Sequence, residues 1–214
     1  MAYTRIKICG ITRPEDAQVA VASGADAIGL VFYAKSPRAV DAAAAREIVA
    51  DVAPFVTVVA LFVDASENAI ETVLASVPVD VIQFHGQETA TYCEQFQRPY
   101  LKALRVKPDL DLESAVSPYK RARGILLDSW QEGVPGGTGK TFDWQLAQQE
   151  IARPMVLAGG LDAGNVGAAI EQLRPAGVDV SGGVEQSPGI KCPKRIAEFI
   201  RAVRTTDSSN SGRK

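Results

Sequence analysis

Two residues of the chain have side chains suited to proton transfer, and each ends a short apolar run. Cys9 closes "KIC" and Asp128 closes "ILLD". A free thiol has a pKa of about 8.5, so its thiolate can accept a proton near neutral pH if neighbouring charges favour it. A carboxyl group after bulky apolar residues is costly to bury without a partner, which favours a functional role for Asp128. Cys9 is equally compatible with a small buried hydrophobic residue.

Two glycine pairs indicate an anion-binding site. Gly159 and Gly160 in "LAGGL", and Gly182 and Gly183 in "VSGGV", each follow an apolar run, and Ser181 precedes the second pair. Bare backbone N–H groups can approach an anion there, and a helix N-terminus after the first pair adds a favourable dipole. Tight turns alone would explain one pair, but they explain both pairs less well. The pattern predicts a phosphorylated small-molecule ligand.

Three further side chains are candidates for contact with such a ligand. Arg38 follows the Ser-Pro turn of "KSPR", and guanidinium groups bind carboxylates and phosphates bidentately. Gln83 and His85 are two residues apart in "VIQFH", so both point to one face of a strand. A solvated surface arginine and a structural histidine are the alternatives for this set.

The stretch "GVPGGTGKT" at 133–141 superficially matches an ATP-binding loop. That motif requires glycine, four residues, and then Gly-Lys-Ser/Thr, but Val134 stands where the leading glycine should be. The preceding apolar run also ends at Asp128, several residues before the glycines. We therefore interpret the stretch as a loop that folds over bound substrate and excludes water.

The candidate residues lie at the ends of β-rich runs that alternate with helical stretches. Most of these runs are almost continuously apolar, as strands covered on both faces should be. Eight such units favour a single-domain α/β fold, the (β/α)₈ TIM barrel, with function at the C-terminal strand ends. An open doubly wound sheet is the alternative, but it would show a glycine fingerprint after the first strand, which "CGITRPEDA" lacks. The predicted strands are 5–9, 27–32, 57–63, 81–85, 100–106, 124–129, 154–160 and 177–183.

Composition limits the class of protein. We expect residues 1–205 to form the barrel and the polar stretch 206–214 to be a flexible tail. The net charge of −2 without a basic block makes nucleic acid an improbable partner. The longest apolar stretch, 55–63, is too short to cross a membrane, and the N-terminus lacks a signal-peptide pattern.

The cysteine and histidine content bears on metals and on the cellular compartment. Three cysteines, an odd number, argue against a disulfide framework and fit a reducing cytoplasm. They form no CxxC pair, and the single histidine cannot complete a zinc site, so no metal is expected.

Seven motifs, in order along the chain, resemble those of the phosphoribosylanthranilate isomerase family of tryptophan biosynthesis. They cover residues 7 to about 189 and read "KICGIT", "GLVFYAKSPR", "VIQFHG", "LLDS", "GGTGKTFDW", "LAGGL" and "GVDVSGGVE". The resemblance implies a (β/α)₈ barrel and an Amadori rearrangement without metal or organic cofactor. The substrate would be N-(5-phosphoribosyl)anthranilate and the product 1-(2-carboxyphenylamino)-1-deoxyribulose 5-phosphate. A monomer and a homodimer are both compatible with the sequence.

The resemblance also implies residue roles. Cys9 matches the general base, Asp128 the general acid, and Arg38 the arginine that holds the anthranilate part. Phosphate binding falls to the two glycine loops, with Gly159, Gly160, Ser181, Gly182 and Gly183. Gln83, His85 and Asp179 fall on substrate-site positions. Lys7, one pleat below Cys9, is expected to favour the thiolate electrostatically.

The chain departs from the family pattern at two positions. Gly182 replaces a second serine, so one hydroxyl to the phosphate is missing, and Cys192 replaces a common aspartate before a helix.

Two alternative functions would require other residues. A barrel synthase such as indole-glycerol-phosphate synthase would need a lysine and glutamate set at strand ends, and the expected strand ends carry no glutamate. A phosphosugar-binding barrel without activity would have no use for the acid and base.

Overall fold

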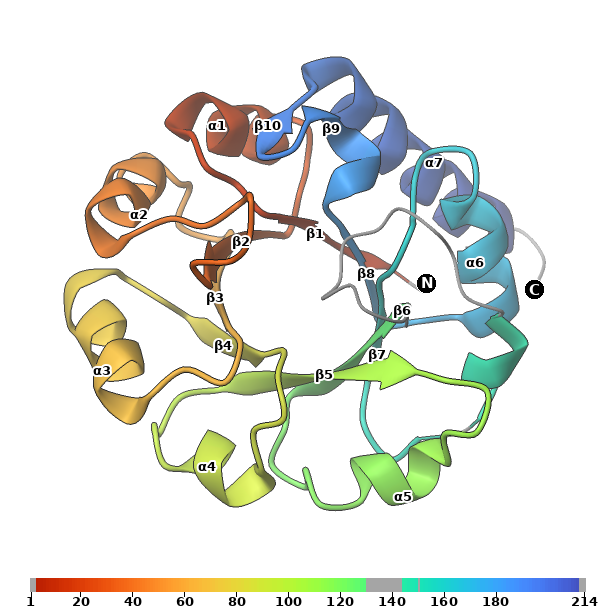
Figure 1. Cartoon of the computed structure of the whole chain (residues 1–214). Helices are drawn as coiled ribbons and strands as arrows, with labels where there is room; N and C mark the ends of the chain where they lie inside the picture. Colours follow the sequence, from red (N-terminus) through yellow and green to blue (C-terminus); the bar gives the residue numbers. More distant parts are fainter. Residues whose placement is uncertain (1–2, 130–143, 150, 212–214) are drawn as a thin grey trace.

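Eight parallel strands close into a barrel in chain order, and β8 pairs with β1 to complete it (Figure 1). The computed structural model describes residues 3–129, 144–149 and 151–211. The predicted (β/α)₈ architecture is confirmed, and every predicted strand is present with an identical or slightly earlier end. The strands are β1 (Arg5–Cys9), β2 (Ala27–Phe32), β3 (Thr57–Phe62), β4 (Val81–Phe84), β5 (Tyr100–Val106), β6 (Gly124–Ser129), β7 (Met155–Leu157) and β8 (Gly177–Val180).

The helices lie outside the barrel (Figure 1), and local sequence features explain where two of them begin. Pro14 occupies the first turn of α1, where its missing N–H costs nothing. The Ser66 hydroxyl accepts a hydrogen bond from the Ala69 N–H and caps α3. The helices are α1 (Pro14–Ala22), α2 (Ala42–Val49), α3 (Glu67–Ser76), α4 (Ala90–Glu94), α5 (Leu112–Val116), α6 (Val166–Leu173) and α7 (Pro193–Ser211), with short 3₁₀ turns η1 (Trp144–Ala147) and η2 (Gly182–Val184).

Two sets of buried side chains follow from the strand pleat, because successive residues point to opposite faces. Ile6 and Ile8 point outward and pack in the large core beneath the helices. Cys9 and its neighbours point inward, where small apolar clusters fill the barrel. The inward clusters are Cys9, Val31 and Leu61 on one side and Ala103, Leu126 and Ala158 on the other.

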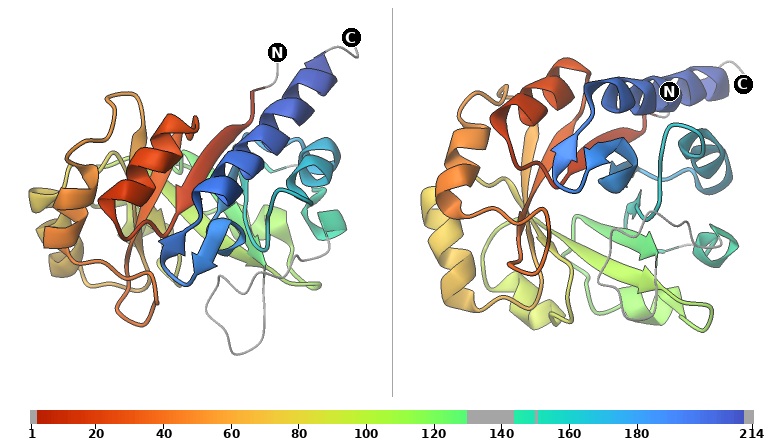
Figure 2. Two further views of the ribbon diagram at one scale, coloured as in Figure 1. Left: turned by 90° about the horizontal axis from the view of Figure 1, so that it is seen from above. Right: turned by 45° about the horizontal axis from the view of Figure 1, so that its top comes forward.

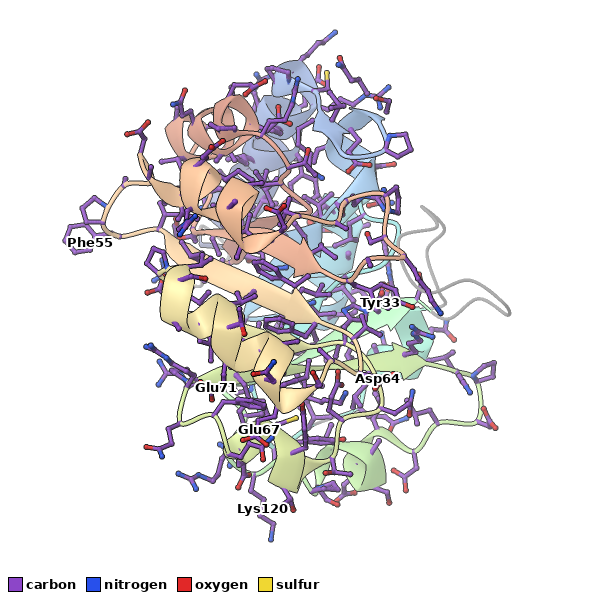
Figure 3. The ribbon with its side chains drawn as sticks, turned by 60° about the vertical axis from the view of Figure 1, so that its left-hand side comes forward. Tyr33, Phe55, Asp64, Glu67, Glu71 and Lys120 are labelled. Atoms are coloured by element: carbon purple, nitrogen blue, oxygen red, sulfur yellow. The ribbon has the colours of Figure 1, made fainter. Side chains whose placement is uncertain are left out.

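The two ends of the barrel differ in what they carry. The N- and C-termini lie at one end in Figure 2, and the β9–β10 hairpin (Glu185–Ser187 and Ile190–Lys191) lies at the other. Figure 3 shows the same separation: Tyr33, directly after β2, and Phe55, before β3, project at opposite ends. The hairpin was not predicted. It follows β8 and therefore adds side chains at the C-terminal ends of the strands.

The C-terminal segment departs from the predicted flexible tail. Helix α7 continues to Ser211, beyond the expected boundary at residue 205. The Thr4 backbone N–H and hydroxyl both donate to the Asp207 carboxylate, at 2.9 and 2.7 Å. These buried hydrogen bonds fix a polar segment that its composition alone marks as disordered. In the described part of the chain, no helix has the length and apolar character needed to cross a membrane.

A buried ion pair joins β5 to the loop that follows β4, and its acid also bonds the loop that follows β3. The Lys102 ammonium lies 2.9 Å from the Glu88 carboxylate and donates to the Gly86 carbonyl at 2.7 Å. The other Glu88 bonds come from the backbone N–H groups of Asp64 and Gly86. Both charged side chains are 2% exposed. Since Gly86 directly follows His85, this pair holds the β4 end of the active-site mouth in place.

We expect Lys102→Met to destabilise the fold by about 3–5 kcal/mol, because it leaves the Glu88 charge buried without its counter-ion. The double variant Lys102→Met/Glu88→Gln should lose less stability than the single variant. Urea unfolding followed by circular dichroism measures both, and Lys120→Met, at an exposed position (Figure 3), is the control. A loss below about 1 kcal/mol for Lys102→Met would contradict the pairing argument.

Candidate active site

A cavity of about 470 Å³ lies at the C-terminal ends of the strands. It brings together nearly all of the residues predicted from the sequence. Gln83 is the exception, since it is fully buried behind His85 and does not line the cavity. The predicted residues in the lining are Cys9, Arg38, His85, Asp128, Gly159, Gly160, Asp179, Ser181, Gly182 and Gly183. Sequence reasoning did not find Tyr33, Lys35 and Arg105, which also line it.

Cys9 lies above a buried ion pair. Strand register places Lys7 beside Asp179, and the Lys7 ammonium lies 2.8 Å from the Asp179 carboxylate. Cys9 pairs in register with Gly29 on β2. A Cβ atom at Gly29 would come within 2.8 Å of the Cys9 sulfur and 3.0 Å of the Lys7 nitrogen. The missing side chain of Gly29 therefore provides the space that the thiol and the ammonium occupy.

The surroundings of Cys9 act on its pKa in opposite directions. Burial and the Asp179 charge raise the pKa of Cys9, while the charge and hydrogen bond of Lys7 lower it. The net effect is a pKa above the ordinary value. Lys7 thus acts in the predicted direction, but burial outweighs it. Burial also works against the charge of Lys7, yet Asp179 and Cys9 together raise the pKa of Lys7, so its ammonium stays charged.

Asp128 is held by two nitrogen atoms, one from its own strand and one from the residue that follows β4. Its Oδ1 accepts the backbone N–H of Ser129 at 2.8 Å, and its Oδ2 lies 3.1 Å from His85 Nε2. The other ring nitrogen of His85 lies 3.0 Å from Gln83 Nε2. The Asp128 residue is 5% exposed and lies at the cavity wall. It can therefore exchange a proton with a ligand while its two oxygens stay oriented.

Arg38 is oriented by an acid from the β9–β10 hairpin. Its Nε and Nη2 donate to the two Glu185 oxygens at 2.8 and 2.7 Å, and the Lys191 ammonium lies 2.8 Å from the same carboxylate. Burial alone would raise the pKa of Glu185, but the bonds from Arg38 and Lys191 bring it below the ordinary value. Nη1 of Arg38 makes no hydrogen bond within the described ranges, which leaves it for a ligand. The sequence signal for this hairpin was the turn-forming "SPG" at 187–189.

The two glycine loops approach each other closely. Gly159 has φ of +82°, and a Cβ atom there would lie 2.4 Å from the Ser129 nitrogen. A Cβ atom at Gly183 would lie 2.0 Å from the Leu161 carbonyl oxygen. Both positions therefore require glycine. Behind them, Lys191 donates to the Ser181 carbonyl at 3.2 Å and brings a buried positive charge to the anion loops. The predicted covering loop at 133–139 lies outside the described residues.

Comparison with known proteins gives one consistent result. A family model described as N-(5'phosphoribosyl)anthranilate (PRA) isomerase matches residues 6–202. The N-(5'-phosphoribosyl)anthranilate isomerase of Pseudomonas putida (strain W619) is 59% identical over 204 residues, which cover 95% of this chain and 99% of that protein.

Solved structures of the same kind superpose closely. The crystal structure of phosphoribosyl anthranilate isomerase from Thermotoga maritima has a TM-score of 0.87 at 41% identity, covering 94% of this chain and 99% of that one. A second crystal structure is a phosphoribosyl anthranilate isomerase in complex with reduced 1-(o-carboxyphenylamino)-1-deoxyribulose 5-phosphate. It has a TM-score of 0.83 at 39% identity, with the same coverage of 94% and 99%.

The site geometry predicts that Lys7→Met raises the pKa of Cys9 further, because it removes the ammonium that lowers this pKa and leaves Asp179 unpaired. Alkylation of Cys9 by iodoacetamide near pH 8, followed by mass spectrometry of its peptide, should slow by about tenfold or more, since each unit of pKa changes the thiolate fraction tenfold. Lys7→Met/Asp179→Asn should recover part of the rate. An unchanged rate in Lys7→Met would remove the electrostatic role of Lys7.

Proposed function

Because the chain belongs to the N-(5'-phosphoribosyl)anthranilate isomerase family, and so catalyses the isomerase step of tryptophan biosynthesis, we propose that Cys9 is its general base and Asp128 its general acid. The single observation that carries this assignment is that both residues line one cavity. They reach it from β1 and β6, and the glycine loops after β7 and β8 lie between them in barrel order.

The proposed reaction begins with proton donation. Asp128 donates a proton to the furanose ring oxygen of the substrate, the bond from that oxygen to C1 breaks, and the anilino nitrogen forms a Schiff base with C1. The carboxylate of Asp128 then keeps the hydrogen bond from the Ser129 N–H, which stabilises its negative charge. The hydrogen bond between His85 Nε2 and Asp128 Oδ2 also stabilises this negative charge when His85 is the donor.

The second half of the reaction is proton abstraction. The Cys9 thiolate removes the proton from the sugar C2, the electron pair forms an enolamine, and tautomerisation gives the ketone. The raised pKa of Cys9 makes the thiolate a minor form at neutral pH but also a stronger base. The fraction of Cys9 present as the base should therefore increase with pH until the pKa of Cys9 is reached.

We assign the two anionic ends of the substrate to different elements. The phosphate binds the backbone N–H groups of Gly159, Gly160, Gly182 and Gly183 beside Ser181, supported by the buried Lys191 charge. The anthranilate carboxylate binds the guanidinium of Arg38, which Glu185 holds in position. His85 and Asp179 remain proposed substrate contacts because both line the cavity.

The compartment and the assembly are also proposals. Cys9, Cys93 and Cys192 are all free thiols, and a thiol base requires a reducing environment, which supports a cytoplasmic enzyme. The ligand is a small molecule. A monomer and a homodimer both remain possible assemblies in this proposal, and sedimentation velocity distinguishes them.

Cys9→Ala and Asp128→Asn should each lower kcat by about 10²–10⁴-fold, because each removes one positioned proton transfer. The fluorescence decrease on consumption of phosphoribosylanthranilate measures this rate, and complementation of an isomerase-deficient tryptophan auxotroph gives an independent readout. Wild-type growth and turnover by the double variant would refute both role assignments.

Arg38→Met should raise KM by about 10- to 100-fold and change kcat much less, because hydrogen bonds to charged groups contribute roughly 1.5–3 kcal/mol. Glu185→Gln should raise KM in the same direction by loosening the guanidinium. The same fluorescence assay measures both, with Arg46→Met, exposed on α2, as the control. If KM stays at its wild-type value in Arg38→Met, the carboxylate binds elsewhere.

A further inference from the structure

Gln83 has a place in the structure that packing does not explain. Its side chain is fully buried, and its amide nitrogen lies 3.0 Å from His85 Nδ1. Within the described ranges, its amide oxygen has no hydrogen-bond partner. Burying an amide with an unsatisfied oxygen costs stability. Among the described residues, the one polar contact of this side chain is with His85, which places its role there.

The amide group determines which nitrogen of His85 carries the proton. An amide N–H can only donate, so the Nδ1 atom that faces it must be the acceptor and carry no proton. In a neutral imidazole the proton then resides on Nε2, the nitrogen 3.1 Å from Asp128 Oδ2. His85 is consequently a donor to Asp128.

This tautomer matters for a carboxylic acid that must give its proton to a substrate. When His85 donates to Oδ2 and the Ser129 N–H donates to Oδ1, neither neighbour can accept the proton of Asp128. The acidic proton is then left to point into the cavity. In the opposite tautomer the bare Nε2 would accept this proton and hold it away from the substrate.

We propose that Gln83 is a positioning residue that keeps the His85 proton on Nε2, so that Asp128 directs its own proton to the substrate. This proposal rests on the proposed role of Asp128 as the general acid. It assigns Gln83 to a function through His85 in place of direct substrate contact. Arg105, next to Asp128 in strand register, is the charged neighbour on β5.

Nuclear magnetic resonance of the imidazole ring tests this proposal directly. The chain contains a single histidine, so ¹⁵N-histidine labelling reports the two ring nitrogens of His85 alone. At about pH 8.5, above the titration range of an ordinary imidazole, the wild-type enzyme should show a protonated Nε2 and an unprotonated Nδ1. A proton on Nδ1 would overturn the proposal.

Variants at Gln83 connect the tautomer to turnover. Gln83→Glu offers a carboxylate acceptor, so Nδ1 should gain a proton and kcat should fall by about 10- to 100-fold, less than the loss of the acid itself, with KM changed less than about twofold. Gln83→Leu should show both tautomers and an intermediate kcat. Gln18→Glu, exposed on α1, should change neither.

The outcomes separate this proposal from the role of Asp128. If Gln83→Glu has a proton on Nδ1 of His85 and still has the wild-type kcat, the tautomer proposal is wrong. A pure Nε2 tautomer in Gln83→Leu would also overturn the proposal. The leucine variant provides the test if the glutamate variant does not fold. Full turnover by Asp128→Asn would refute the acid assignment, while the ring-nitrogen signals of His85 in the wild-type enzyme would still report the tautomer.

Discussion

A charge inside a closed barrel of eight strands must have a partner, because the interior is packed with side chains and excludes water. Lys7 meets this constraint through Asp179, and Arg38 meets it through Glu185. The Lys7 ammonium is shared between Asp179 and the Cys9 thiol, while the carboxyl group of Asp128 is bonded to a backbone N–H and to an imidazole. Because the other charged groups are paired with one another, Cys9 and Asp128 remain available for the proposed proton transfers.

The two proposed proton-transfer groups have different environments. Cys9 lies against an ion pair and apolar side chains, and burial there outweighs the nearby ammonium of Lys7. Asp128 is bonded to a backbone N–H and to an imidazole, which donates to it in the tautomer that we propose Gln83 selects. Environments that separate the behaviour of two titratable groups are how one site performs acid and base chemistry together.

The sequence was sufficient to predict the barrel and the positions of the strand ends, because hydrophobic periodicity and local caps are encoded by neighbouring residues. Cys9 and Asp128 were predicted as site residues because each ends an apolar run, and both line the cavity. Glu185 and Lys191 were not found, because Glu185 matters through its contact with Arg38, which is distant in the chain, and Lys191 matters through its contact with Glu185. Likewise, the polar C-terminal segment is helical because Asp207 meets Thr4, a contact that composition does not show.

The central claim is that one sugar ring lies between the Cys9 thiol and the Asp128 carboxyl group. A crystal structure of this enzyme with reduced 1-(o-carboxyphenylamino)-1-deoxyribulose 5-phosphate tests it most directly. The account predicts the ribulose carbons within contact of both side chains and the phosphate on the loops of Gly160 and Gly183. A sugar chain in contact with only one of the two groups would contradict it.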